Sequence, residues 1–168
     1  FLHRIIQAKG LTHAAGLLNG ILMPTPSAVM KAMELLARGC EGEAGIGDLV
    51  AVDVGGATTD VYSMAKGMPT ASNTVYKGLP EPYAKRTVEG DIGMRYSIHG
   101  IVDAAGIERV SELSGLSEDR AAELIEMLAT HTDMIPDGNA ELEALDYALA
   151  SLAIETAVTR HAGSMEET

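Results

Sequence analysis

The sequence predicts an α/β fold, a mixture of helices and short strands, over its 168 residues. Apolar residues recur at helical spacing in segments 25–38 and 140–161, whereas the run Leu49–Val52 is short, apolar and rich in β-branched residues. Stretches rich in glycine and proline separate these segments. A chain of this length can form one domain with its own core or a part of a larger protein.

The N-terminal part is expected to contain two helices. The first covers 1–9 and ends at Gly10. In the second, Thr25 is expected to cap the helix and Pro26 to occupy its first position, where a missing N–H has no effect. Gly39, just beyond the last apolar residue, predicts the end of this helix.

A strand–turn–strand unit is expected next. Leu49–Val52 predicts a strand buried on both faces, the pair Gly55-Gly56 predicts a tight turn, and Val61–Met64 predicts the returning strand. Thr74–Tyr76 offers a third, shorter strand. Residues 78–87 contain two prolines and are expected to form an exposed loop.

The C-terminal half is predicted to be helical. One helix is expected from Gly93 to about Ala105, and Ser117 is expected to cap a second. Segment 140–161 predicts a single long helix. The expected buried faces are Ala121, Leu124, Ile125 and Leu128 of the second helix, and Leu142, Leu145, Leu149, Leu152, Ala153 and Thr156 of the long one.

Composition argues against several classes of partner. No apolar run approaches the ~20 residues that a membrane span requires, so no membrane partner is expected. Twelve Lys and Arg against 24 Asp and Glu give a net charge of −12, which repels a phosphate backbone, so no nucleic-acid partner is expected. The single cysteine, Cys40, fits a reducing compartment, and we expect a cytoplasmic protein. Because the sequence starts at Phe1, we expect it to be part of a longer protein.

Segment 53–60 carries more polar residues than a turn requires. Adjacent glycines leave backbone N–H groups uncovered, so phosphate oxygens can approach them. Asp53 is a hard oxygen ligand suited to Mg²⁺ or to one of its waters, and Asp60 can orient a second water. Thr58 and Thr59 add hydroxyl donors at the same edge. The spacing fits an ordinary hairpin with solvated polar residues equally well, and that alternative stays open.

Other candidate sites have less support. Cys40 has no obvious activating base nearby in the sequence, and Ser63 lacks the Gly-x-Ser-x-Gly elbow of a serine hydrolase. The histidines show no i, i+4 pairing and no cysteine partner, so each is expected to be exposed or hydrogen-bonded rather than a metal ligand. They are His3, His13, His99, His131 and His161.

Residues 53–61 (DVGGATTDV) resemble the second phosphate motif of the actin-like ATPases, a superfamily that includes sugar kinases, actin and the heat-shock chaperones. Upstream, 23–29 (MPTPSAV) is similar to the helix that connects the two lobes of those proteins. Downstream, 89–95 (EGDIGMR) is similar to a turn that opens a helix in the chaperones. The resemblance implies a ribonuclease-H-like lobe with a small helical insertion, and ATP and Mg²⁺ as cofactors.

A narrower resemblance is to the MutL/GlmL family. It is carried by 9–11 (KGL), 21–29 (ILMPTPSAV), 47–60 (GDLVAVDVGGATTD) and 86–95 (RTVEGDIGMR). That family is accessory to adenosylcobalamin-dependent glutamate (methylaspartate) mutase. The resemblance therefore implies that mutase as a partner and an ATP-dependent reactivating or chaperone-like function. It leaves the oligomeric state unknown.

The resemblance also implies roles for single residues. Asp53 would bind a water of the magnesium ion, and Asp60 would assist. Gly90 and Asp91 are weaker candidates near the nucleotide. The phosphates would be held by Gly55, Gly56, Ala57, Thr58 and Thr59.

The resemblance divides the chain into four parts. They are a lead-in with the lobe-connecting helix (1–47), the hairpin, strands and helix of the nucleotide lobe (48–102), a small helical insertion (103–139), and a long helix returning to that lobe (140–168). The superfamily's first phosphate hairpin and its adenosine motif do not occur in these residues. We therefore expect this chain alone to be inactive as an ATPase.

Two alternatives to the accessory function remain at this point. Hydantoinase and oxoprolinase subunits carry a similar Asp-x-Gly-Gly strand turn and would couple ATP to ring opening. A non-catalytic actin-like scaffold would bind nucleotide and partner without turnover.

Overall fold

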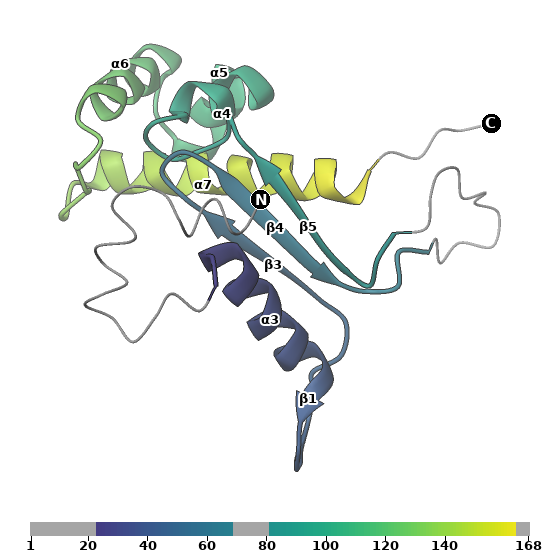
Figure 1. Cartoon of the computed structure of the whole chain (residues 1–168). Helices are drawn as coiled ribbons and strands as arrows, with labels where there is room; N and C mark the ends of the chain where they lie inside the picture. Colours follow the sequence, from purple (N-terminus) through teal and green to yellow (C-terminus); the bar gives the residue numbers. More distant parts are fainter. Residues whose placement is uncertain (1–22, 69–80, 164–168) are drawn as a thin grey trace, which may run out of the picture. The chain divides into compact units, whose positions relative to one another are not determined.

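The structure of the protein is a computed structural model, which describes residues 23–68 and 81–163 (Figure 1). Within these ranges it has helices and two small antiparallel sheets, so the α/β class is confirmed. The chain forms two compact units, Phe1–Leu49 and Val50–Thr168. The helix expected over 1–9 and the strand expected at Thr74–Tyr76 lie outside the described residues.

The first unit contains helix α3 (Thr25–Arg38), followed by strands β1 (Gly39–Cys40) and β2 (Glu43–Ala44), which pair with each other. The helix ends as predicted: Gly39 has φ +82°, which favours glycine, and a Cβ there would overlap the carbonyl of Glu43. The prediction that Thr25 caps the helix is wrong by one position. Pro24 is the cap residue, Thr25 is the first helical residue, and no side chain caps this end.

The second unit is a three-stranded sheet with helices on one face. Strands β3 (Leu49–Val54), β4 (Thr59–Met64) and β5 (Ala84–Glu89) lie in the order β3-β4-β5. The prediction that the first of these strands is buried on both faces is wrong: among the described strands β3 lies at the edge of its sheet, and Val50 is 57% exposed. The returning strand is confirmed, and it lies at the centre of the sheet.

The predicted exposed loop is wrong from residue 84 onward. Residues 84–89 form β5, which pairs with β4 along its whole length, from Thr59 opposite Glu89 to Met64 opposite Ala84. Because its polar side chains have partners on β4 and on the last helix, the strand accommodates residues that suggested a loop.

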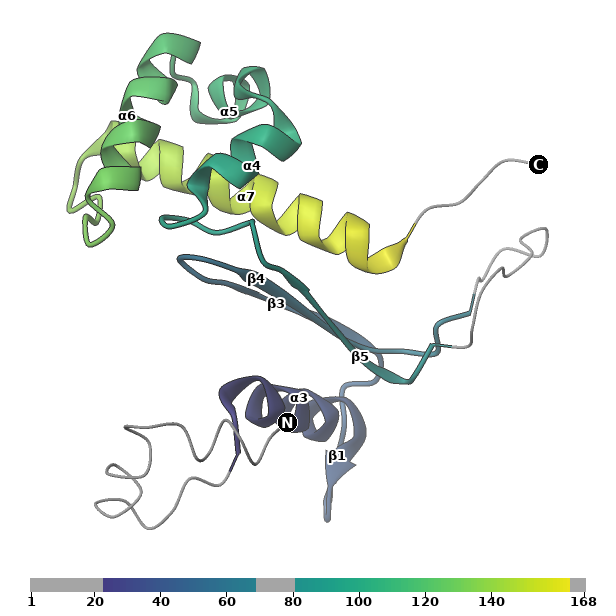
Figure 2. The same ribbon diagram turned by 45° about the horizontal axis from the view of Figure 1, so that its top comes forward.

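Four helices follow the sheet: α4 (Ile98–Ala105), α5 (Ile107–Ser114), α6 (Glu118–Thr130) and α7 (Ala140–Ala162). Helix α7 packs on β4 and β5, helices α4 and α5 pack on α7, and α6 packs on α4 and α5 (Figure 2). The helix predicted from Gly93 begins only at Ile98, because the N–H groups of residues 94–96 donate to the hairpin instead of opening a helix.

The predicted ends of the last two helices are confirmed, and so are their predicted buried faces except at Thr156, which is only half-buried. Ser117 accepts a hydrogen bond from Arg120 N, and Asn139 caps α7 by accepting from Glu141 N and Leu142 N. None of the described helices is long and apolar enough to cross a membrane. The buried core comprises Ile92, Ile98, Ile101, Val110, Ala121, Leu124, Ile125, Leu128, Leu142, Leu145, Leu149, Leu152 and Ala153.

Candidate functional site

The turn between β3 and β4 consists of residues 55–58. The N–H of Gly55 donates to the carbonyl of Thr58 at 2.8 Å. Neither Gly55 nor Gly56 has a positive φ, so backbone conformation does not require these glycines. A Cβ at Gly55 would lie only 3.0 Å from the oxygen of Thr58, and one at Gly56 would lie 3.5 Å from the Tyr96 ring. The absence of side chains therefore keeps the turn narrow and its backbone uncovered.

The carbonyl groups and the N–H groups of this turn differ in their hydrogen bonding. The carbonyl of Gly55 accepts from Met94 N at 2.9 Å, and the carbonyl of Gly56 accepts from Arg95 N at 2.9 Å and Tyr96 N at 2.8 Å. In the part of the chain that the structure describes, the N–H groups of Gly56 and Ala57 have no hydrogen-bond acceptor. The turn therefore has carbonyls fixed by the protein and amide groups available to a ligand, the arrangement that an anion requires.

Asp53 and Asp60 lie opposite each other on β3 and β4. The hydrogen bond from Gly55 N to Thr58 O sets the register, and continuing it along the antiparallel pair places Val54 opposite Thr59 and Asp53 opposite Asp60. Val54 packs against the helical core and Thr59 is fully buried. Because neighbouring residues on a strand point to opposite faces, the two aspartates are on the face away from the helices.

The two aspartates differ in their partners. Asp60 forms an ion pair with Arg86, whose Nη2 and Nε lie 2.5 and 2.7 Å from its Oδ1, and the guanidinium also lies over the Tyr62 ring at 5.9 Å. Asp53 is exposed and has no ion pair with any described residue. Like charges opposite each other destabilise a sheet, and Arg86 offsets that repulsion. Asp53 is thus the carboxylate left available for an external cation.

The structure places the hydroxyl of Thr59 away from the edge at which we expected it. Thr59 is completely buried, and its Oγ1 donates to the carbonyl of Ile92 at 3.0 Å. This hydroxyl therefore links β4 to the segment after β5. Thr58 is half-buried within the turn itself.

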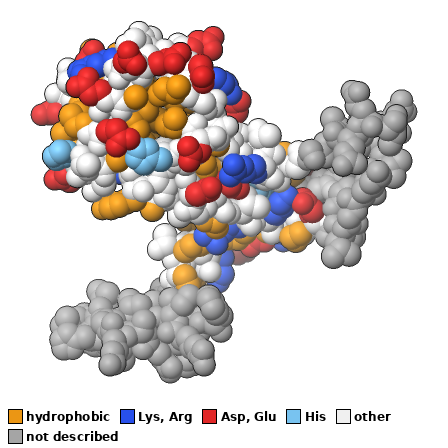
Figure 3. Space-filling view, turned by 90° about the horizontal axis from the view of Figure 1, so that it is seen from above, with side chains coloured by type: hydrophobic (Ala, Val, Ile, Leu, Met, Phe, Trp, Pro, Cys, Tyr) orange, Lys and Arg blue, Asp and Glu red, His pale blue; other side chains and the backbone are white. Residues whose placement is uncertain are grey.

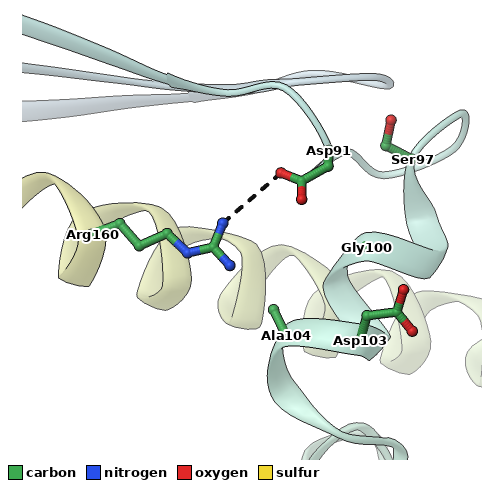
Figure 4. Close-up of a pocket in the computed structure, with 6 residues that line it drawn as sticks. All are labelled: Asp91, Ser97, Gly100, Asp103, Ala104 and Arg160. Carbon is green, nitrogen blue, oxygen red and sulfur yellow. Dashed lines mark ion pairs between the residues drawn. The ribbon is translucent and has the colours of Figure 1, made fainter.

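Asp91 lines a pocket to which neither Gly90 nor the hairpin contributes. Asp91 is exposed, lies 3.9 Å from the Nη1 of Arg160, and contributes to an open pocket of about 390 Å³ between α4 and α7 (Figure 4). No residue of the 55–58 turn lines that pocket. Its lining residues are Asp91, Ser97, Gly100, Asp103, Ala104 and Arg160.

The donor set of the hairpin fits a magnesium ion that also binds phosphate. Mg²⁺ in nucleotide sites is held by one or two carboxylates, and its remaining ligands are waters and phosphate oxygens. Asp53 and the neighbouring Asp60 supply carboxylates at the end of the hairpin whose amide groups are open. Among the described residues no group of three or more His, Cys, Asp and Glu side chains could hold a metal ion by itself. Any metal here would share its coordination with a ligand.

Sequence reasoning did not identify two structurally important residues, Arg95 and Gly93. The side chain of Arg95 donates hydrogen bonds to Asp146 on α7. A Cβ at Gly93 would lie 2.6 Å from the Cα of Ala57. Both lie in the segment 89–95 that carried the resemblance. Their contacts are with residues far away in the sequence, so local spacing contained no signal for them.

His161 is hydrogen-bonded, as predicted, and it is also buried. Its Nδ1 lies 2.7 Å from Thr87 Oγ1 and its Nε2 lies 2.8 Å from Ser63 Oγ. Burial lowers the pKa of the imidazole, and the charge of Lys85 lowers it further. A hydrolase triad would need a carboxylate on the second nitrogen, where the structure has the hydroxyl of Thr87. This cluster is therefore structural.

Acidic side chains are scattered over the described part of the face that Figure 3 shows, with basic and apolar side chains among them. Several of the arginines are neutralised by these carboxylates. Arg120 pairs with Glu123 and Glu141, and Arg109 pairs with Glu155. The N–H groups of Gly56 and Ala57, which have no acceptor among the described residues, offer an anion donors that need no basic side chain.

Two comparisons with known proteins, a family model and a curated relative, agree with each other. A family model described as MutL protein matches residues 1–168. A curated relative, Protein MutL of Clostridium tetanomorphum, is 44% identical over 166 residues, which is 99% of this chain and 36% of the relative. The chain thus spans about a third of the length of that relative. No solved structure matches the chain.

Proposed function

The chain belongs to the MutL family, and from this we propose that it supplies one side of an ATP site in an accessory protein of adenosylcobalamin-dependent glutamate mutase. The family membership supports the mutase as the partner. The hairpin supports nucleotide as the ligand. In this proposal the bound nucleotide determines whether two lobes are open or closed, and this changes how the protein binds the mutase.

The observation that carries the nucleotide proposal is the asymmetry of the 55–58 turn. Its glycine carbonyls accept three hydrogen bonds from residues 94–96, whereas the N–H groups of Gly56 and Ala57 remain open. Backbone N–H groups held in this way bind phosphate oxygens without needing a basic side chain. That property suits a chain with a net charge of −12.

Asp53 is assigned to the magnesium side of the site. It is exposed, has no ion pair with any described residue, and lies just before the turn. There it would hold the ion directly or through one of its waters. Bound there, magnesium would neutralise phosphate charge. Asp60 is held by Arg86 and is assigned a supporting role, to orient water beside Asp53.

Phosphate release by the full-length protein tests the nucleotide proposal. Asp53→Ala should lower the rate by about 10–100-fold, the usual effect of losing a residue that orients a metal ligand. Asp133→Ala is the matched control, because Asp133 is exposed in the connection between α6 and α7 and should be neutral. Equal release by the wild type and Asp53→Ala would leave only the non-catalytic scaffold.

Capture of the mutase tests the partner proposal separately. Full-length protein immobilised with ATP and without it is incubated with purified glutamate mutase, and the bound corrinoid enzyme is measured by its absorbance. We expect retention that changes with nucleotide. Retention in neither condition would contradict the accessory function, and ring opening of a hydantoin coupled to ATP would favour the hydantoinase alternative.

A further inference from the structure

We infer that Arg95 is a positioning residue for the 55–58 turn, which it holds in the shape that binds phosphate. This inference rests on the proposed function, since it concerns the same turn. It adds a residue that contacts no part of the ligand. Three features of the structure support it.

The first feature is the attachment of the turn to the segment that contains Arg95. The N–H groups of Met94, Arg95 and Tyr96 make three hydrogen bonds of 2.8–2.9 Å to the carbonyls of Gly55 and Gly56. When these carbonyls are fixed, the peptide planes of the turn are fixed too, and with them the directions of the open N–H groups. Displacing the 94–96 segment would therefore rotate the groups proposed to bind phosphate.

The second feature is that every N–H donor of the Arg95 guanidinium has a hydrogen-bond acceptor. Nη1 and Nη2 donate to the two carboxylate oxygens of Asp146 at 3.0 and 2.8 Å. Nη1 also donates to the carbonyl of Met94 at 2.7 Å, and Nη2 and Nε donate to the carbonyl of Met134 at 3.2 and 3.3 Å. All five N–H donors have acceptors, in a side chain that is 13% exposed. Lysine has three donors and cannot reproduce this planar arrangement.

The third feature is where these acceptors lie in the chain. Asp146 is on α7 and Met134 is in the connection between α6 and α7, 51 and 39 residues away from Arg95. The side chain thus joins the segment under the turn to the helical core. A rigid connection of this kind lowers the entropy lost when the ligand binds, because the N–H donors of the turn are already in place.

The test is made on full-length protein with Arg95→Lys and Asp146→Asn. Each variant should lower the affinity for Mg·ATP relative to adenosine by about tenfold, since only ATP contacts the turn through its β- and γ-phosphates. Amide hydrogen exchange of Gly55 and of residues 94–96, whose N–H groups make the hydrogen bonds that hold the turn, should also become faster. The ratio of the two affinities, and the exchange of these amides relative to that of core amides, are not changed by a uniform loss of stability.

Arg109→Lys is the matched control. Arg109 makes a similar planar pair with Glu155 on α7, at 2.8 and 2.9 Å, but its pair does not include the turn or residues 94–96. It should leave both measurements at the wild-type value. If Arg95→Lys fails to fold, Asp146→Asn decides the question, because it keeps the size and one acceptor of the side chain.

The possible outcomes separate this inference from the proposed function. If wild-type protein binds no Mg·ATP, the proposed function fails, and the relative exchange of Gly55 and residues 94–96 alone decides whether Arg95 holds the turn. If wild-type protein binds Mg·ATP and both variants keep the wild-type affinity ratio, Arg95 is not a positioning residue and the inference is overturned.

Discussion

At the scale of single residues, the glycines of this chain have different functions that the sequence does not distinguish. Gly39 has a positive φ at the end of α3, whereas Gly93 allows two backbone segments to touch. A Cβ on Gly93 would lie 2.6 and 2.7 Å from the Cα and N of Ala57, closer than folded proteins allow. Gly90, three residues earlier, has open space around it.

Gly93→Ala should destabilise the second unit by about 1–3 kcal/mol, the usual effect of overpacking against a fixed backbone. The same substitution should weaken Mg·ATP binding, because the clash displaces the turn at Ala57. Urea denaturation and nucleotide titration measure the two effects.

Gly90→Ala is the control for this substitution. It should change the free energy of unfolding by less than about 0.5 kcal/mol, as surface substitutions usually do. If the two variants were equally stable, the close packing of Gly93 on Ala57 would be refuted.

At the scale of helices and strands, periodic segments were predicted well and strands with polar residues were not. The ends and buried faces of α6 and α7 follow from capping residues and from apolar spacing, which are local properties. Strand β5 has the sequence Ala-Lys-Arg-Thr-Val-Glu, and only its pairing with β4 and its partners Asp60 and His161 make a strand of it. Such partners are distant in the sequence, so no local pattern contains them.

The C-terminal end of α7 is held on the sheet by His161, and this predicts a pH dependence. Its imidazole is bonded to Ser63 on β4 and Thr87 on β5, and burial together with Lys85 lowers its pKa below the usual 6.5, whereas Glu81 opposes this shift. The unfolded chain then binds more protons than the folded one as the pH falls below about 6.5. The contribution of His161 to stability should therefore be complete above that pH and decrease below it.

Urea denaturation at pH 5.5 and pH 7.5 checks this expectation. Wild-type protein should lose more stability on acidification than His161→Gln, which has no group to protonate at this position. Nuclear magnetic resonance should give an imidazole pKa for His161 below 6.5. A measured value at or above 6.5 would contradict the effect of burial.

At the scale of the whole molecule, the described hairpin is one side of the proposed ATP site. The 168 residues contain the hairpin that we propose to bind phosphate, and they span 36% of the curated relative. In the actin-like ATPases that this chain resembles, a second hairpin and an adenosine motif complete the ATP site. Nucleotide affinity should then depend on the parts of the protein beyond this chain.

Titration of Mg·ATP into the 168-residue chain should accordingly show no tight binding, whereas the full-length protein should bind. Isothermal calorimetry of both under the same conditions makes the comparison. A sub-micromolar dissociation constant for the chain alone would show that this unit is a complete site and would remove the argument for two lobes.

The sequence by itself determined the α/β class, the hairpin with its glycine and aspartate residues, the two long C-terminal helices and the family, because these depend on local spacing and on residues in a continuous segment. Only the tertiary structure decided that β3 lies at the edge of the described sheet, that Asp60 is neutralised by Arg86, that the hydroxyl of Thr59 is internal, and that Arg95 joins the turn to α7. Each of these depends on contacts between residues far apart in the chain. Folding alone determines which polar group of the motif receives a partner and which remains open.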